Sequence, residues 1–496
     1  MNYFKRVVLI GAAVSLLVGC AQGATSAPTT PGPGVAGGLA AGRAPGLDPN
    51  SPVTITIWHY WTGAVLNAFD AMLNEFNETL GMERGIIVEG VSFGSIGELE
   101  SAVRASAHEE AGSMDLPNIF SSFPDTAYVT QQLGLLSNLD DYFTPEQQAE
   151  YFPPFINRGR IGLEGELRIF PTSKAAEILM VNETDWRPFA DEHGFTDADL
   201  QTMEGIARVA EVYYHWSGGK AFFGRDAFAN MFVIGSKQFG TEIFEVEAGQ
   251  GTINIDEVAM RRIWDYYYTP FISGYFAAHG RFRSDDVRVG DLLAYVGSTV
   301  SAVFFPDEVM IDGVSRPIEA TVLMPPLFEG GAPVMVQQGP GKVVTLATPG
   351  EQYASLIFLR WFTEPDQNLR FSALTGYMPV RQAAMYPQLI RDAADEAGIS
   401  LRDVTYDTLT VALGGVMYSE LYNTRSFTGG VAARAVINTH LRNKALEDRA
   451  EIISLIESGT PREAAIAQFA TDERFEGWIA DLEAELISAI EAELRS

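Results

Sequence analysis

Cysteine is almost absent from this chain of 496 residues, because Cys20 is the only one. A disulfide within one subunit is therefore impossible, and no cysteine remains in the rest of the chain for a structural zinc site. Basic residues are scarce as well, since 34 Lys and Arg residues accompany 64 Asp and Glu residues, for a formal net charge of −30. This charge argues against nucleic acid as a partner and against docking onto anionic lipid.

Catalytic and metal-binding motifs are also missing. None of the six histidines forms an H-E-x-x-H pair, and no G-x-S-x-G elbow occurs. The stretch Gly341-Lys342-Val343 is not a phosphate loop, because Val336 stands where the leading glycine belongs and no Ser or Thr follows the lysine. We therefore expect a protein that is not an enzyme and that uses no metal and no cofactor. The paired carboxylates of a glycosidase leave no sequence pattern, so that alternative stays open.

Long uncharged apolar runs are missing from the chain after residue 51, which excludes a membrane-spanning segment there. The N-terminus does carry an apolar stretch, residues 7–18, behind Lys5 and Arg6. This stretch is shorter than the roughly 20 residues of a spanning helix, so we interpret residues 1–19 as a signal peptide.

The end of this stretch, Leu17-Val18-Gly19-Cys20, resembles the lipobox of bacterial lipoproteins. The resemblance implies that cleavage falls before Cys20 and that this residue carries a diacylglyceryl group. Gly, Ala, Pro, Ser and Thr dominate the following segment, so we predict a flexible tether over residues 20–51. The protein is then expected to be lipid-anchored on the extracellular or periplasmic side of a cell membrane.

The body begins with alternating strand and helix patterns. Strands are predicted over residues 53–58, 86–91 and 117–120, and helices over 65–76 and 99–108. This alternation is typical of an α/β protein with a parallel sheet. In such sheets ligands bind beyond the carboxyl ends of the strands.

Aromatic residues gather at the end of the first predicted strand, where Tyr60 and Trp61 follow His59. Flat rings suit sugars, because a pyranose presents an apolar C–H face. Further aromatic clusters contain Trp216 and Phe305. Burial in the core is the alternative interpretation for each of these rings.

Five separated motifs make the chain recognisable. They are Trp-His-Tyr-Trp-Thr-Gly at 58–63, Leu-Pro-Asn-Ile at 116–119, Phe-Pro-Thr-Ser at 170–173, Thr-Gly-Tyr-Met-Pro-Val at 375–380 and Gly-Thr-Pro at 459–461. In this order the chain resembles the family 1 extracellular solute-binding proteins of ABC importers, which bind carbohydrates and glycerol 3-phosphate.

The resemblance implies a two-lobe, periplasmic-binding-protein-like fold of type II, with the ligand cleft between the lobes. The N-terminal lobe would hold residues 53–170 plus 306–347. The C-terminal lobe would hold residues 174–303 plus 352–496. The protein would work as a monomer whose partners are a small-molecule ligand and the permease subunits in the membrane.

Three ligand contacts follow from the family pattern, namely Gly339, Tyr377 and Arg434. The family's ligand tyrosine after the second strand falls near Ile96, and its glutamate after the third strand falls near Pro124 or Asp125. Because these two positions depart from the pattern, a sugar is favoured over glycerol 3-phosphate. The full set of expected ligand contacts is His59, Tyr60, Trp61, Ser95, Asp125, Trp216, Phe305, Gln338, Gly339, Tyr377 and Arg434.

The function predicted from the sequence is capture of a mono- or oligosaccharide by lobe closure and its delivery to a membrane permease. A glycerol 3-phosphate or glycerophosphodiester importer component is the first alternative. A secreted glycoside hydrolase and a lipoprotein that reports its ligand to a kinase are the others.

Overall fold

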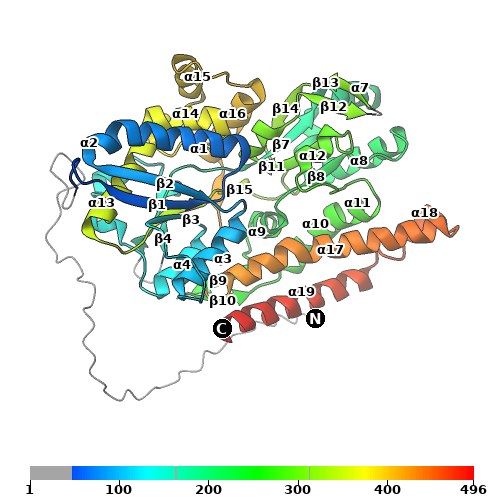
Figure 1. Cartoon of the computed structure of the whole chain (residues 1–496). Coiled ribbons are helices and arrows are strands. Elements are labelled where there is room, and N and C mark those ends of the chain that lie inside the picture. The colour runs from blue at the N-terminus through cyan, green and yellow to red at the C-terminus, as the bar shows by residue number, and fades with distance from the viewer. Residues whose placement is uncertain (1–46, 162–164, 248, 312, 496) are drawn as a thin grey trace.

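The computed structural model describes residues 47–161, 165–247, 249–311 and 313–495. The predicted signal peptide, Cys20 and most of the predicted tether lie outside these residues. The described chain forms two α/β lobes that lie side by side (Figure 1), as the sequence predicted. No helix among the described residues is long and apolar enough to cross a membrane.

The first lobe is built on a five-stranded sheet. Its strands, in spatial order, are β2 (Ile86–Ser92), β1 (Val53–His59), β3 (Ile119–Ser122), β16 (Gly341–Val344) and β6 (Ile169–Phe170). Strand β1 is parallel to β2 and β3, whereas β16 is antiparallel to β3 and β6. Ile55 and Ile57 are fully buried, because alternation of β-branched residues places both on one face of β1.

Helices cover this sheet and supply most of its core. The helices that contact its strands are α1 (Gly63–Phe76), α3 (Ile96–Ala107), α4 (Pro124–Gln132) and α13 (Pro349–Phe362). In the same lobe, α6 (Pro153–Asn157) adds Phe155 to the core, α14 (Pro365–Thr375) packs on α1, and α15 (Pro387–Glu396) packs on α14. The buried residues of α1 recur every three or four positions, as in an amphipathic helix. Phe69 and Phe76 contact Phe362 and Phe358 of α13, with ring centroids 5.8 and 5.2 Å apart.

The second lobe has a four-stranded sheet of order β14 (Ala320–Leu323), β7 (Glu177–Asn182), β11 (Ala294–Ser298) and β8 (Phe223–Arg225). Every residue of β7 is buried, because strands flank it on both sides. The main helices of this lobe are α7 (Glu183–His193), α8 (Met203–Trp216), α9 (Phe228–Gln238), α16 (Asp403–Tyr418), α17 (Gly430–Glu457) and α19 (Asp472–Arg495). Helices α17 and α19 lie against one another at the C-terminal end (Figure 1).

Three chain segments meet where the lobes join. The backbone of Ala175 exchanges two hydrogen bonds with that of Gln338, at 3.0 and 2.8 Å. The backbone of Lys174 exchanges two with that of Met378, at 3.2 and 2.6 Å. The predicted first crossing and the Thr-Gly-Tyr-Met-Pro-Val motif are therefore neighbours at the junction.

The expected lobe boundaries differ from the observed packing in two places. Residues 320–323 were assigned to the N-terminal lobe, but as β14 they pair with β7 in the second sheet. Residues 352–375 were assigned to the C-terminal lobe, but α13 and α14 pack on β1 and α1 of the first. The short segment 345–348 after β16 explains the second difference, because it keeps α13 beside the sheet that β16 belongs to.

Candidate functional site

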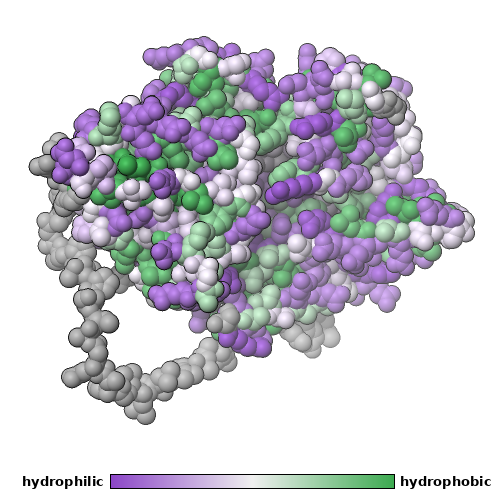
Figure 2. Space-filling view, viewed as in Figure 1, coloured by the Kyte–Doolittle hydropathy of each residue, from purple (hydrophilic) through white to green (hydrophobic). Residues whose placement is uncertain are grey.

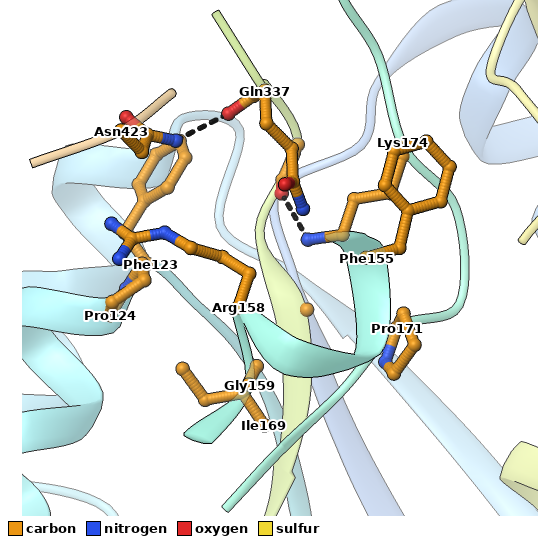
Figure 3. Close-up of a pocket in the computed structure, with 12 residues that line it drawn as sticks. Phe123, Pro124, Phe155, Arg158, Gly159, Ile169, Pro171, Lys174, Gln337 and Asn423 are labelled. Carbon is orange, nitrogen blue, oxygen red and sulfur yellow. Dashed lines mark hydrogen bonds between the residues drawn. The ribbon is translucent and has the colours of Figure 1, made fainter. Parts of the chain in front are cut away.

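A pocket lies at the junction of the lobes, beside the crossing segments (Figure 3). Its 12 lining residues are Phe123, Pro124, Phe155, Arg158, Gly159, Ile169, Pro171, Lys174, Gln337, Gly339, Gly341 and Asn423. On the surface, Figure 2 shows a furrow between the two lobes. The pocket therefore occupies the position at which a two-lobed protein can enclose a small molecule.

Lys174 brings a buried amine to this pocket. Its side chain is only 5 % exposed, and its Nζ donates a hydrogen bond to the carbonyl oxygen of Gly339 at 3.0 Å. Burial, with a smaller contribution from the nearby charge of Arg158, lowers the pKa of this amine to about 7. Gly339 has a φ of +87°, a conformation that suits glycine and that turns the crossing segment at this point.

Arg158 follows α6 and reaches across the junction. Its Nη2 donates to the carbonyl oxygen of Thr424 in the second lobe at 2.5 Å, while its buried Nε has no hydrogen-bond partner among the described residues. Burial lowers the pKa of this guanidinium to about 10, against the opposing effect of Asp125. Asn423 lines the same wall and donates from Nδ2 to the backbone oxygen of Gln337 at 2.5 Å.

Asp125 and Arg434 connect the two lobes beside the pocket. Asp125 lies in the first turn of α4, and Arg434 lies near the start of α17. Burial raises the pKa of Asp125, whereas the charges of Arg158 and Arg434 oppose that rise. Arg434 also donates from Nη2 to Oδ1 of Asn230 at 2.7 Å, so its guanidinium is fixed from the second lobe.

An aromatic cluster surrounds Tyr377 near the junction. Trp61 donates from Nε1 to the Tyr377 hydroxyl at 3.1 Å, and the Tyr60 hydroxyl lies 2.9 Å from the same oxygen. Lys342 of β16 places its Nζ 4.1 Å from the centroid of the Trp61 ring. Trp61 and Tyr377 are only 4 % and 5 % exposed, and the amine of Lys342 covers one face of the Trp61 ring. The ring that was expected to stack on a sugar is therefore already in contact with protein atoms.

His59 belongs to the core of the first lobe rather than to the pocket. It is 1 % exposed, and its ring contacts those of Trp61 and Phe69. Burial, with a smaller contribution from the charge of Lys342, lowers the pKa of the imidazole to about 3. The ring is therefore neutral at physiological pH.

The structure gives three other expected contacts different roles. Ser95 caps α3, because its hydroxyl accepts a hydrogen bond from the backbone N–H of Glu98 at 3.2 Å. Phe305 is buried and stacks on Tyr295 with ring centroids 6.4 Å apart. Trp216 is the last residue of α8, is 46 % exposed and is not among the residues that line the pocket.

Four of the expected contacts do come together at the junction. Gly339 lines the pocket, and Gln338 precedes it in the crossing segment. Asp125 is adjacent to the lining residue Pro124, and Arg434 exerts its charge on Asp125. These four residues therefore lie in or next to the pocket, whereas most of the side chains that line it were not among the expected contacts.

The polar lining side chains that were not expected are Arg158, Lys174, Gln337 and Asn423. The buried amine of Lys342, which does not line the pocket, was not expected either. Lys174 directly follows the recognised Phe-Pro-Thr-Ser motif, so a lysine at the start of a buried crossing was a readable signal. A single lysine among the apolar residues of β16 was a similar signal at Lys342. Among the described residues, no group of three His, Cys, Asp or Glu side chains could hold a metal ion.

The sequence and the fold are similar to those of known proteins. The model of the family described as "Bacterial extracellular solute-binding protein" matches residues 71–395. A search of curated protein sequences finds no match.

Solved structures of similar fold include three binding proteins. The cyclic α-maltosyl-1,6-maltose binding protein from Arthrobacter globiformis aligns with a TM-score of 0.63 and 18% identity, over 89% of this chain and 100% of that one. UgpB from Mycobacterium tuberculosis, in complex with glycerophosphocholine, aligns at 0.62 and 17%, over 89% and 100%. A maltotriose-bound MalE domain from Bdellovibrio bacteriovorus aligns at 0.59 and 12%, over 90% and 100%.

Proposed function

The chain belongs to the family of bacterial extracellular solute-binding proteins, and we propose that it is the substrate-binding lipoprotein of an ABC importer. The pocket at the junction is the observation that carries this proposal. Phe123 reaches it from the first lobe and Asn423 from the second, beside the crossing segments at Gly339. A ligand held there contacts both lobes, so its binding energy favours the closed arrangement.

The proposed cargo is a sugar, taken up by lobe closure and passed to a membrane permease. Phe123 and Phe155 supply apolar pocket walls, while Gln337 and Asn423 supply amides for hydroxyl groups. Micromolar affinity corresponds to about −8 kcal/mol, which a few ring contacts and hydrogen bonds supply. Two of the neighbours in fold are named for maltose-type sugars, and this supports the proposal for the ligand class.

A thermal-shift panel of mono- and oligosaccharides and glycerophosphodiesters tests capture. A ligand at 100 times its dissociation constant adds about 2.7 kcal/mol to the free energy of unfolding. Absence of any shift across the panel contradicts the proposal. Release of shorter sugars from oligosaccharides supports the glycoside hydrolase alternative instead.

Lipid anchoring at Cys20 completes the proposed function, because a tethered capture protein stays near its importer. The test is the partitioning of the full chain and of Cys20→Ala between detergent and aqueous phases. The anchored protein should enter the detergent phase, whereas the variant should remain in the aqueous phase. Equal partitioning of the two proteins contradicts the anchor.

A further inference from the structure

A group of arginines lies around the side chain of Tyr267 inside the second lobe, and none of these residues lines the pocket. The group consists of Arg225 at the end of β8, Arg283 at the start of α12 (Arg283–Arg288) and Arg442 on α17. We propose that these residues bind a small monovalent anion of the chloride type beside the Tyr267 hydroxyl. The proposed site lies within one lobe and is separate from the proposed sugar pocket.

Packing holds the Tyr267 side chain in the interior. This residue belongs to the helical segment η4 (Trp264–Tyr268), and its side chain is fully buried. Its ring contacts those of Phe228 and Phe276, with centroids 4.9 and 5.6 Å apart. The hydroxyl has no hydrogen-bond partner among the described residues. Because a buried hydroxyl without a partner is costly, a ligand that accepts its proton stabilises the folded lobe.

Arg225 and Arg283 reach this group from neighbouring segments. A Cβ atom at Gly224 would lie 2.9 Å from Cδ of Arg283, so the Arg283 side chain packs on β8 directly before Arg225. The two arginines are only 6 % and 4 % exposed. The Nε atom of each is buried and lacks a hydrogen-bond partner among the described residues. Two charged N–H groups therefore have no acceptor at this end of β8.

Arg442 approaches the group from α17. One helical turn earlier, Oδ1 of Asn438 accepts a hydrogen bond from the backbone N–H of Ala229 at 3.2 Å. Ala229 follows Phe228, whose ring contacts Tyr267, so this face of α17 lies beside the phenol. The Nε atom of Arg442 is also buried without a partner among the described residues.

The three arginines act on the same hydroxyl. Burial raises the pKa of the Tyr267 phenol, and the positive charges of the three arginines oppose this rise. The carboxylate of Asp226 acts in the other direction. Guanidinium groups donate hydrogen bonds and accept none, so the partner that this group lacks is an acceptor.

The carboxylates of this region are engaged by two of the three arginines. Glu177 accepts from Arg225 at 2.8 Å. Asp286 lies 2.6 Å from Nη1 of Arg283, and Asp226 lies 3.5 Å from its Nε. The third arginine forms no ion pair within the described part of the chain, so an anion beside it supplies the missing counter-charge.

A halide suits this set of donors better than a water molecule does. A chloride ion accepts hydrogen bonds from several directions, whereas water must also donate two protons, and the unpartnered groups here are donors. Helix α9 starts at Phe228, and Ala227 before it supplies no side-chain cap, so the positive end of the helix dipole adds to the attraction. Arg442 is half-buried, which leaves an ion a route from solvent.

Halide exchange tests this inference without any sugar. Thermal unfolding of the full chain in detergent is compared in sodium chloride, sodium bromide and sodium gluconate at equal ionic strength. Chloride and bromide should raise the unfolding temperature by about 2 °C or more over gluconate, and the rise should saturate with concentration. Equal unfolding temperatures in the three salts overturn the proposal.

Variants locate the effect. Tyr267→Phe removes one donor and keeps the ring, so it should at least halve the chloride-dependent shift, and Arg442→Gln should remove most of it. The matched controls are Tyr266→Phe, on the same segment, and Arg208→Gln, which changes a 59 % exposed arginine, and both should keep the full shift. A full shift in Tyr267→Phe and Arg442→Gln overturns the site.

Bromide also gives a direct readout that needs no variant. Crystals grown in sodium bromide should show an anomalous scattering peak within hydrogen-bond distance of the Tyr267 hydroxyl. A peak that is absent there, or that occurs only on surface residues, overturns the proposal even where a variant fails to fold. Since none of these measurements contains a sugar, their outcome is independent of the proposed capture function.

Discussion

The hydroxyl groups of Tyr60 and Tyr377 lie 2.9 Å apart, although 317 residues separate them in the sequence. Trp61 donates to the same Tyr377 oxygen, so two side chains converge on this one buried polar atom. Tyr377 was expected to touch ligand, yet its hydroxyl is engaged inside the protein. The cluster therefore ties the Thr-Gly-Tyr-Met-Pro-Val segment to the end of β1.

Replacing Tyr377 by Phe should lower the free energy of unfolding by about 1–3 kcal/mol, because Trp61 Nε1 then loses its buried acceptor. Urea denaturation measures this change. Tyr386→Phe is the matched control, since Tyr386 is 62 % exposed, and it should have little effect. If Tyr377→Phe keeps full stability but weakens binding, the hydroxyl contacts ligand instead.

Replacing Trp61 by Ala should destabilise the first lobe by about 3–5 kcal/mol, as for other buried tryptophans. The ring contacts Phe69 at 4.7 Å and Phe371 at 5.4 Å between centroids, so its removal leaves a cavity. Urea denaturation again gives the value. A stable Trp61→Ala protein with weakened sugar affinity would return this ring to the ligand site.

Replacing Trp216 by Ala should leave ligand affinity unchanged. Its Nε1 donates to Glu192 at 3.2 Å and its ring contacts Phe189 at 5.2 Å, and both partners belong to α7. Calorimetric titration checks this expectation. A loss of affinity beyond about threefold, roughly 0.7 kcal/mol, would contradict it.

Replacing Lys342 by Met should stabilise the protein at pH 7 by on the order of 2 kcal/mol. Burial lowers the pKa of this amine to about 7 in the folded chain, from about 10.5 in the unfolded chain. Between these values the unfolded state binds more protons, so wild-type stability rises with pH. The advantage of Lys342→Met should therefore be greatest at and below pH 7 and should shrink towards pH 10.

Urea denaturation at pH 7 and 9.5 measures this difference. Lys220→Met is the control, because an exposed lysine has little effect on stability. A constant difference between Lys342→Met and wild type across this range would show that Lys342 is not a destabilising buried amine.

Charge reversal at Arg104 should weaken the closed arrangement of the lobes. Arg104 of α3 lies 3.3 Å from Glu493 of α19, so this ion pair joins the first lobe to the second. Because Arg104 is half-exposed, Arg104→Glu should reduce ligand affinity only about two- to fivefold. The double variant Arg104→Glu/Glu493→Arg should recover affinity, and Arg495→Ala, whose partner Glu491 lies on the same helix, should have no effect.

Much of the architecture was readable from local patterns. The five predicted elements correspond to β1, α1, β2, α3 and β3, with ends displaced by up to three residues. Periodicity identifies such elements because each depends on residues close in sequence. The lobe boundaries were harder to predict, since the pairing of β14 with β7 joins residues more than 100 positions apart in the sequence.

The sequence by itself determined the α/β class, the membership suggested by its motifs and the acidic, cysteine-poor character of the chain. Only the tertiary structure decided which side chains face the junction. The motif before Lys174 signals a lysine at a buried crossing, but β4, β5 and β6 separate it from Arg158, and only the tertiary packing brings both residues to one pocket. Tertiary packing also buries His59, Trp61 and Phe305 in the core. The sequence could not predict this burial, because buried rings and ligand-contacting rings follow the same local sequence pattern.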